Sequence, residues 1–194
     1  MLYYISIKHN YENNIMLEFY LSYQGVLTTT GHTRAKFGLR RYFSPQLVNL
    51  KEYLIQDQAP AACGFRPENR MVVGDFTFLP LVTKASKKVV DLDILVLSDC
   101  DANCSSGFPT GDLDNYAKTI LDGLRMAQTI NEIRDHCPKE NEDLLYVLME
   151  DDQIVRNLNI RHHKNLFPVL GDTKMRAREV FVLIKVNIFD KYSI

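Results

Sequence analysis

Residues 111–124 of this chain of 194 residues read GDLDNYAKTILDGL, and they predict a helix around which the rest of the fold can be placed. Asp114 and Lys118 are four residues apart, as are Lys118 and Asp122, so the three side chains would share one helix face. Acidic residues near a helix N-terminus also interact favourably with the helix dipole. The pattern therefore fits two interpretations. Asp112 caps a helix that carries ordinary surface ion pairs, or the carboxylates and the lysine are gathered for chemistry.

Strands and one further helix are expected on both sides of this motif. Ser44-Pro45 predicts a helix start, with serine as N-cap and proline in the first turn, and this helix runs to about Gln58 after a polar loop over residues 25–41. The motif helix is expected to extend from Asp112 to about His136. Apolar and aromatic runs predict strands at residues 15–23, 76–82, 89–97, 154–161 and 179–189. This order predicts an α+β fold with a single mixed β-sheet packed with helices, in one domain over residues 1–194.

A second acidic cluster follows the motif helix. Glu150, Asp151 and Asp152 precede the apolar pair Ile154-Val155. This cluster alone could be a solvated turn before a strand. Together the two clusters supply the carboxylate oxygens with which proteins hold Mg²⁺, usually alongside waters and substrate phosphate. In combination they predict a site for magnesium-dependent phosphodiester cleavage.

Composition excludes several other classes of protein. Hydrophobic residues make up 46% and charged residues 24% of the chain, which is typical of a globular protein. The net charge of −1 argues against a protein that coats nucleic acid nonspecifically. Two local basic clusters could still contact DNA, although His162-His163 in the second fits a solvated strand end equally well. The clusters are Arg34, Lys36, Arg40 and Arg41, and Arg156, Arg161, His162, His163 and Lys164.

No apolar run reaches the roughly 18 residues of a membrane span, and the N-terminal residues lack a signal-peptide pattern, so a cytoplasmic protein without a membrane partner is expected. Residues 99–103 imitate the start of a calcium loop, but Cys104 replaces the required glycine and Thr110 the required glutamate. The cysteines lack the paired spacing of a zinc site, so free thiols are favoured over zinc. They are Cys63, Cys100, Cys104 and Cys137.

The order Asp-Leu-Asp-Asn-x-x-Lys, then Asp-Asp-x-x-Val, resembles the RusA family of Holliday-junction resolvases. The motif part of the resemblance covers residues 111–124 and 150–164. It implies a homodimeric endodeoxyribonuclease that uses Mg²⁺, or Mn²⁺ in its place, to resolve branched or four-way-junction DNA in recombination and repair. It also implies a role for each matching side chain: metal ligation by Asp112, Asp114 and Asp152, support by Asp151, and phosphate contact by Lys118. The helical spacing adds Asp122 as a partner of Lys118.

Three regions depart from the family pattern, and one of them, residues 59–75, has no clear counterpart in the family. Residues 125–145 form an atypical insertion between the motif helix and the Asp151-Asp152 pair. Basic residues that family members often carry directly before the motif are replaced by uncharged ones. DNA contacts are therefore expected from Arg34, Lys36, Arg40, Arg41, Arg161 and Lys164. Two alternatives stay open: a catalytically silent branched-DNA-binding protein of the same fold, and an unrelated α+β binding module whose acids only cap a helix.

Overall fold

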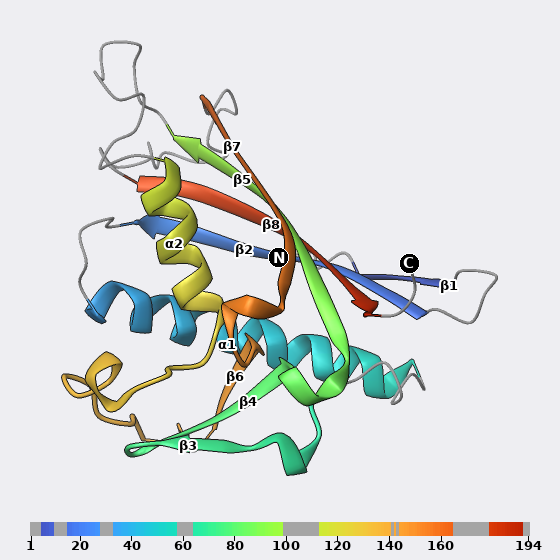
Figure 1. Ribbon diagram of the computed structural model, residues 1–194. Helices are drawn as coiled ribbons and strands as arrows, with labels where there is room; N and C mark the ends of the chain where they lie inside the picture. The colour runs from blue at the N-terminus through green and yellow to red at the C-terminus, as the bar shows by residue number, and fades with distance from the viewer. Residues whose placement is uncertain are drawn as a thin grey trace.

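The computed structural model describes residues 5–9, 15–27, 33–57, 64–98, 113–140, 142, 144–164 and 179–191. These residues form an α+β fold with two helices and two mixed sheets, and α1 passes between the sheets (Figure 1). None of the helices in this described part is long and apolar enough to cross a membrane.

The larger sheet has five strands in the order β1-β2-β8-β5-β7. All neighbours are antiparallel except β5 and β7, which are parallel. Alternate residues of β5 and β8, such as Val90 and Val182, are buried in the main core with both helices. The strands are β1 (Ile5–His9), β2 (Ile15–Val26), β5 (Lys88–Ser98), β7 (Val155–Lys164) and β8 (Glu179–Asp190).

A second, three-stranded sheet contains β3 (Met71–Val73), β4 (Phe76–Val82) and β6 (Leu145–Met149), in the order β3-β4-β6. β3 and β4 are antiparallel, whereas β4 and β6 are parallel. This sheet has its own small core, in which Phe37 of α1 packs with Phe76 and Phe78. The prediction of a single sheet is therefore wrong, because β4 and β5 belong to different sheets although only a short turn separates them.

Helix α1 (Thr33–Gln56) begins eleven residues before the predicted start at Ser44, and Pro45 lies inside it. The Ser44 hydroxyl is not an N-cap but accepts a hydrogen bond from the Tyr146 backbone N–H of β6 at 3.0 Å. The stretch expected to be a polar loop is helical from Thr33 because Phe37 and Leu39 are buried between the sheets.

Helix α2 (Leu113–Leu124) ends well before the predicted His136. Its end is fixed by β6, because Arg125 forms a parallel bridge with Met149, and the Met126 N–H donates to the Met149 carbonyl at 3.0 Å. The chain then continues through turns and the short 3-10 helix η3 (Ile130–Glu132). Residues 125–144 are called the connection below.

The chain passes from the small sheet to the large sheet at two adjacent points. β4 leads into β5 through residues 83–87, the basic turn, which contains the 3-10 helix η2 (Lys84–Ser86). β6 leads into β7 through residues 150–154, the acidic turn, which contains the 3-10 helix η4 (Asp152–Ile154). The Glu150 N–H donates to the Val82 carbonyl at 2.9 Å, so the two turns lie side by side.

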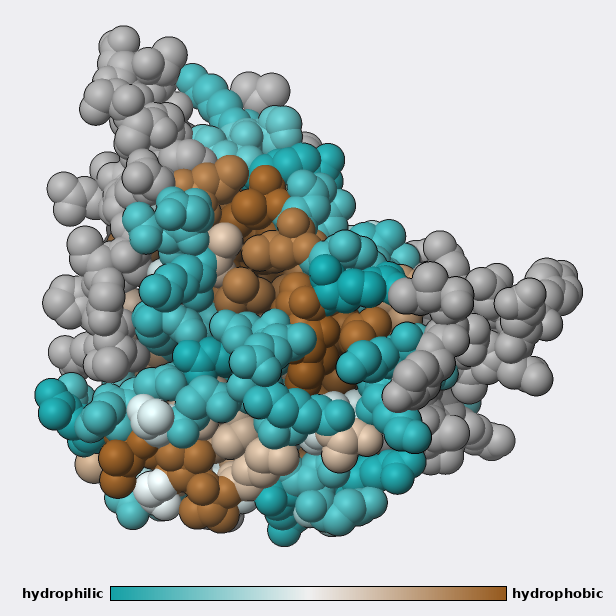
Figure 2. All heavy atoms as spheres, viewed as in Figure 1, coloured by the Kyte–Doolittle hydropathy of each residue, from teal (hydrophilic) through white to brown (hydrophobic). Residues whose placement is uncertain are grey.

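Strand β7 forms an edge of the described sheet, and most of its residues are exposed. Hydrophobic atoms are visible on the face between α2 and the β5–β7 edge, bordered by hydrophilic atoms (Figure 2). Leu158 of β7 is 40% exposed, so this strand is only partly covered by the described residues.

Candidate functional site

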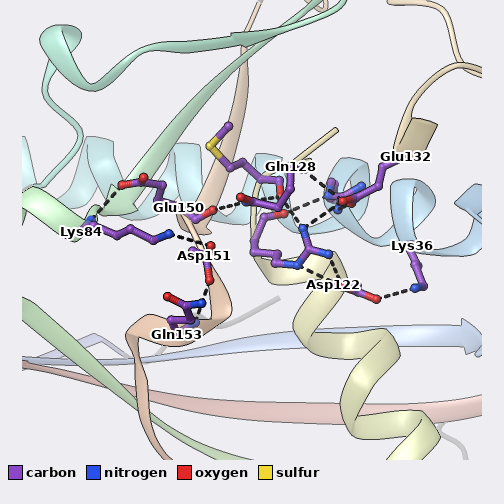
Figure 3. A network of polar contacts seen from close by, with 11 residues as sticks. Lys36, Lys84, Asp122, Gln128, Glu132, Glu150, Asp151 and Gln153 are labelled. Atoms are coloured by element: carbon purple, nitrogen blue, oxygen red, sulfur yellow. Dashed lines mark hydrogen bonds and ion pairs between the residues drawn. The ribbon is translucent and has the colours of Figure 1, made fainter. Parts of the chain in front are cut away.

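The acidic turn is held by the basic turn through two hydrogen bonds, both from Lys84 (Figure 3). The Lys84 ammonium donates to Asp151 Oδ2 at 2.8 Å, and the Lys84 backbone N–H donates to Glu150 Oε2 at 2.8 Å. Asp151 Oδ1 accepts from the Gln153 backbone N–H at 2.9 Å and so caps η4. One lysine therefore orients two consecutive carboxylates of the turn.

Asp151 and Asp152 have opposite electrostatic environments. The hydrogen bonds from Lys84 and from the Gln153 N–H lower the pKa of Asp151, against a smaller opposing effect of burial. Burial raises the pKa of Asp152, and the neighbouring Asp151 raises it further, while the positive charge of Arg125 opposes the shift. Asp152 consequently binds a proton more readily than an ordinary aspartate.

The acidic residue of α2 nearest this turn is Asp122. Its side chain is 7% exposed and accepts hydrogen bonds from Arg125 at 2.6 and 3.0 Å. Lys36 of α1 forms an ion pair with the other Asp122 oxygen at 2.5 Å. Burial raises the pKa of Asp122, but Lys36 and Arg125 together outweigh burial and leave the pKa lowered. The predicted pairing of Asp122 with Lys118 is replaced by these two cations, because α1 packs against that end of α2.

Arg125 joins this cluster to the connection and to α1. Its guanidinium also lies 3.3 Å from Glu132, which accepts a hydrogen bond from Arg40 at 2.7 Å. Arg40 Nε donates to the Arg125 carbonyl at 2.9 Å. Gln128 Nε2 donates to the Glu150 carbonyl at 2.6 Å. A continuous polar network thus runs from α1 through the connection to the acidic turn (Figure 3).

The described side chains of the first predicted DNA-binding cluster form ion pairs with acidic residues of the protein itself. Arg40 is fully buried, so the prediction that it contacts DNA is wrong. Arg41 is bound by both oxygens of Glu142, at 2.7 and 2.6 Å, and its guanidinium lies over the Phe37 ring. Lys36 holds Asp122, and the side chain of Arg34 lies outside the described part of the structure.

The second basic cluster lies on β7. Arg161 is 55% exposed and pairs with Asp93 of β5 at 3.0 Å, and Lys164 is exposed at the end of the strand. His162 Nε2 lies 2.7 Å from the Ser98 hydroxyl, and burial together with the charge of His163 lowers the pKa of His162. DNA contact by Arg161 and Lys164 stays a prediction.

The structure brings the acidic turn to the C-terminal end of α2, where Asp122 and Arg125 both affect the pKa of Asp152. Asp114 is exposed in the first turn of α2, and Lys118 is exposed one turn later. Asp114 precedes Asp122 by eight residues, which is about 12 Å along a helix axis. Among the residues described, no group of three or more acidic, histidine or cysteine side chains could hold a metal ion. The predicted ligand Asp112 lies outside those residues.

Three residues of this polar network were not predicted from the sequence to belong to it: Lys84, Arg125 and Glu132. The basic turn was visible as a lysine-rich turn between two strands. Its contact with Asp151 depends on the parallel pairing of β4 with β6, which brings the ends of both strands together and has no local sequence signal. Arg125 and Glu132 lie in the stretch that was predicted to continue the motif helix to about His136.

Of the four cysteines, Cys137 is described, and it is a free, exposed thiol. Cys63, Cys100 and Cys104 lie outside the described residues, as do residues 99–103, which imitate the start of a calcium loop.

No protein-family model, curated protein or solved structure matches this chain. The resemblance to the RusA family therefore stays a prediction made from residues 111–124 and 150–164.

Proposed function

We propose that this protein is a Mg²⁺-dependent endodeoxyribonuclease that cuts branched DNA, such as a four-way junction, as a homodimer of the RusA type. The observation that supports the proposal is that the acidic turn adjoins the end of the motif helix that carries Asp122, although the two segments are far apart in the sequence. The acidic turn follows β6, and β6 fixes the end of α2 through the bond from Met126 to Met149. Metal-assisted phosphodiester hydrolysis requires carboxylates gathered around an ion. Asp122 is the carboxylate of the motif helix next to the acidic turn, and Asp114 lies about 12 Å further along the helix axis.

The donor set supports magnesium. Every proposed ligand, namely Asp112, Asp114, Asp152 and the supporting Asp151, offers carboxylate oxygen, the ligand type that Mg²⁺ prefers. The pKa of Asp152 is raised by burial and by Asp151, so its ionised form lacks full compensation from the described residues. A divalent cation beside the pair would supply that compensation. When bound, Mg²⁺ would polarise the phosphate and activate water for attack.

The chain's own side chains have separate roles in this proposal. Lys118 is exposed on α2 one turn beyond Asp114, where its ammonium can neutralise charge that develops on the phosphate. Asp152 is the proposed metal ligand of the acidic turn, and Asp151 supports it. Lys84 acts indirectly, because it holds Glu150 and Asp151 and thereby sets the position of Asp152. Arg161 and Lys164 remain the predicted DNA contacts on β7.

The test is a nicking assay on a labelled synthetic four-way junction, with Mg²⁺ or with EDTA. Wild type is compared with Asp114→Asn and Asp152→Asn, and Asp135→Asn serves as the control because Asp135 is exposed in a loose pair with Arg134 at 3.7 Å. We expect Mg²⁺-dependent cleavage that falls by about a hundredfold or more in both site variants and is unchanged in the control.

Two results would count against the enzyme. Cleavage at the wild-type rate by both site variants would show that these carboxylates are not part of the site. Tight junction binding by a wild type that never cuts would favour the silent branched-DNA-binding alternative. Sedimentation of the wild type tests the homodimer separately.

A further inference from the structure

A pocket lies beside the basic turn, which binds the acidic turn through Lys84. It has a volume of about 320 Å³ and lies between residues 64–70 and the basic turn. Its walls carry two cationic side chains, Arg66 and Lys88, and one carboxylate, Glu68. The lining also contains the polar residues Asn69, Thr83 and Ser86 and the uncharged residues Gly64, Leu81 and Ala85.

The outer wall of the pocket is held rigidly against β4. Gly64 packs so closely on the Leu81 carbonyl that an added Cβ would lie 1.9 Å from its oxygen. The Gly64 carbonyl accepts from the Arg66 N–H at 2.8 Å and from Asn69 Nδ2 at 3.1 Å. Phe65 is buried and packs edge-on against the Tyr146 ring at 5.2 Å. The wall that carries Arg66 is therefore preformed.

The charge balance of the pocket favours an anion. The Arg66 guanidinium and the Glu68 carboxylate are 3.9 Å apart and 65% and 66% exposed, so their interaction is weak. Arg66 can therefore turn toward a ligand at little cost. None of the residues lining this described pocket is aromatic, so it offers no surface on which a nucleotide base could stack. Its chemistry suits a phosphate group rather than a base.

The location of the pocket connects it with the acidic turn. Its lining residues Thr83 and Ala85 flank Lys84, whose ammonium binds Asp151. The basic turn therefore contacts both the pocket and the acidic turn. Arg40 and Arg41 of α1, which were expected to hold DNA, are instead paired with Glu132 and Glu142.

We infer that this pocket binds a phosphodiester group of the nucleic-acid strand that is held at the acidic turn, and this inference rests on the proposed nuclease function. Arg66 and Lys88 contact the phosphate oxygens, and Ser86 and Asn69 lie beside them as polar neighbours. Lys84 then links the two places, because one turn of the chain both lines the pocket and orients the carboxylates.

The test measures junction binding by fluorescence anisotropy in EDTA, where cleavage does not occur, from about 50 to about 200 mM salt. The double variant Arg66→Ala/Lys88→Ala is compared with Arg134→Ala/Lys139→Ala, which removes the same charge from exposed residues of the connection. We expect the slope of log affinity against log salt to shrink by about 1 for each pocket cation removed. Affinity at intermediate salt should fall about tenfold or more. The control pair should change neither, and thermal unfolding confirms that both variants fold.

The outcomes separate this inference from the proposed function. A pocket variant that matches the control while wild type cleaves junctions overturns the phosphate site and leaves the nuclease intact. If the salt dependence of junction binding is smaller in the Arg66→Ala/Lys88→Ala variant but the wild type does not cleave junctions, the phosphate site is supported and the nuclease proposal is refuted. A wild type that binds no junction refutes both. If inorganic phosphate binds in the pocket but the variant binds junctions normally, the pocket takes a free anion and the inference fails.

Discussion

Replacing Glu132 by alanine should be among the most damaging single changes in this fold, although Glu132 lies outside both predicted acidic motifs. Glu132 accepts a 2.7 Å hydrogen bond from Arg40, whose side chain is fully buried. Burial lowers the pKa of Arg40, and Glu132 is the main group that opposes this effect, with a smaller contribution from Asp122. One terminal nitrogen of Arg40, Nη1, already has no hydrogen-bond partner among the described residues. Without Glu132, a buried guanidinium would lose the carboxylate that balances it.

The size of the effect follows from the difference in burial between the two partners. Removing one member of a buried ion pair costs about 3–5 kcal/mol, because the other charge stays in a poorly solvated place. For a chain of this size, each kcal/mol corresponds to about 2–4 °C in Tm. Glu132→Ala should therefore lower the Tm by about 6–20 °C. Arg40→Met should cost less, about 2 kcal/mol, because the Glu132 side chain is 21% exposed and can be hydrated.

The free energy of unfolding and the Tm of both variants are measured by urea and thermal unfolding, followed by circular dichroism. Asp135→Ala is the matched control, since Asp135 is 65% exposed and its removal should cost less than about 0.5 kcal/mol. The double variant Arg40→Met/Glu132→Leu should be no less stable than Arg40→Met alone, because apolar replacement removes both buried charges. The reasoning is refuted if Glu132→Ala behaves like the control, or if Arg40→Met is the more damaging of the two.

Two further predictions concern α2. The pKa of Asp122 is lower in the folded protein than its ordinary value of 3.8, so its stabilising effect is complete above that value and is lost as the pH falls through the folded pKa. The urea midpoint of wild type should thus drop on acidification below about pH 4, and Asp122→Asn should flatten this part of the curve; parallel curves would contradict the assignment. Gly123→Ala would place a Cβ 2.6 Å from Leu39 Cβ, so it should cost about 1–3 kcal/mol in urea unfolding. A stability equal to wild type would show that α1 and α2 separate easily.

The strands were predictable where burial alternates strictly along the chain. Residues 179–189 have one uninterrupted phase of Val and Ile, and the structure places β8 there with those side chains buried. The prediction for residues 89–97 is confirmed by β5 for the same reason. The distribution of strands between two sheets was not predictable, because a short turn after Val82 looks the same whether it makes a hairpin or a crossing.

The start of α1 was misjudged because its polar residues are satisfied by distant partners. Arg40 and Arg41 made residues 25–41 look like a solvated loop, but Glu132 and Glu142 of the connection neutralise them. These partners lie about ninety to a hundred positions away. Local helix propensity does not show pairing between residues so far apart in the chain. A buried arginine such as Arg40 is therefore easily mistaken for a solvent-exposed residue of a loop.

Part of the candidate site could be predicted and part could not. The position of Asp151 and Asp152 in a turn before a strand was one of the two interpretations of that cluster, and the structure has η4 there, leading into β7. The ion pairs of Asp122 with Arg125 and Lys36 could not be predicted from the sequence. The i,i+4 rule describes side chains of an isolated helix, whereas α2 packs against α1.

The basic turn and the acidic turn, through which the chain passes from the small sheet to the large sheet, also affect how the protein folds. Phe78 pairs with Leu145, and Val90 with Val155, so both parallel ladders close long loops and their formation carries a large entropic cost. The acidic turn lies between these two ladders, and we expect it to assemble only when both have formed. Partly folded chains would then lack the turn altogether. A ligand that binds there would raise the midpoint of global unfolding, rather than protect a local segment.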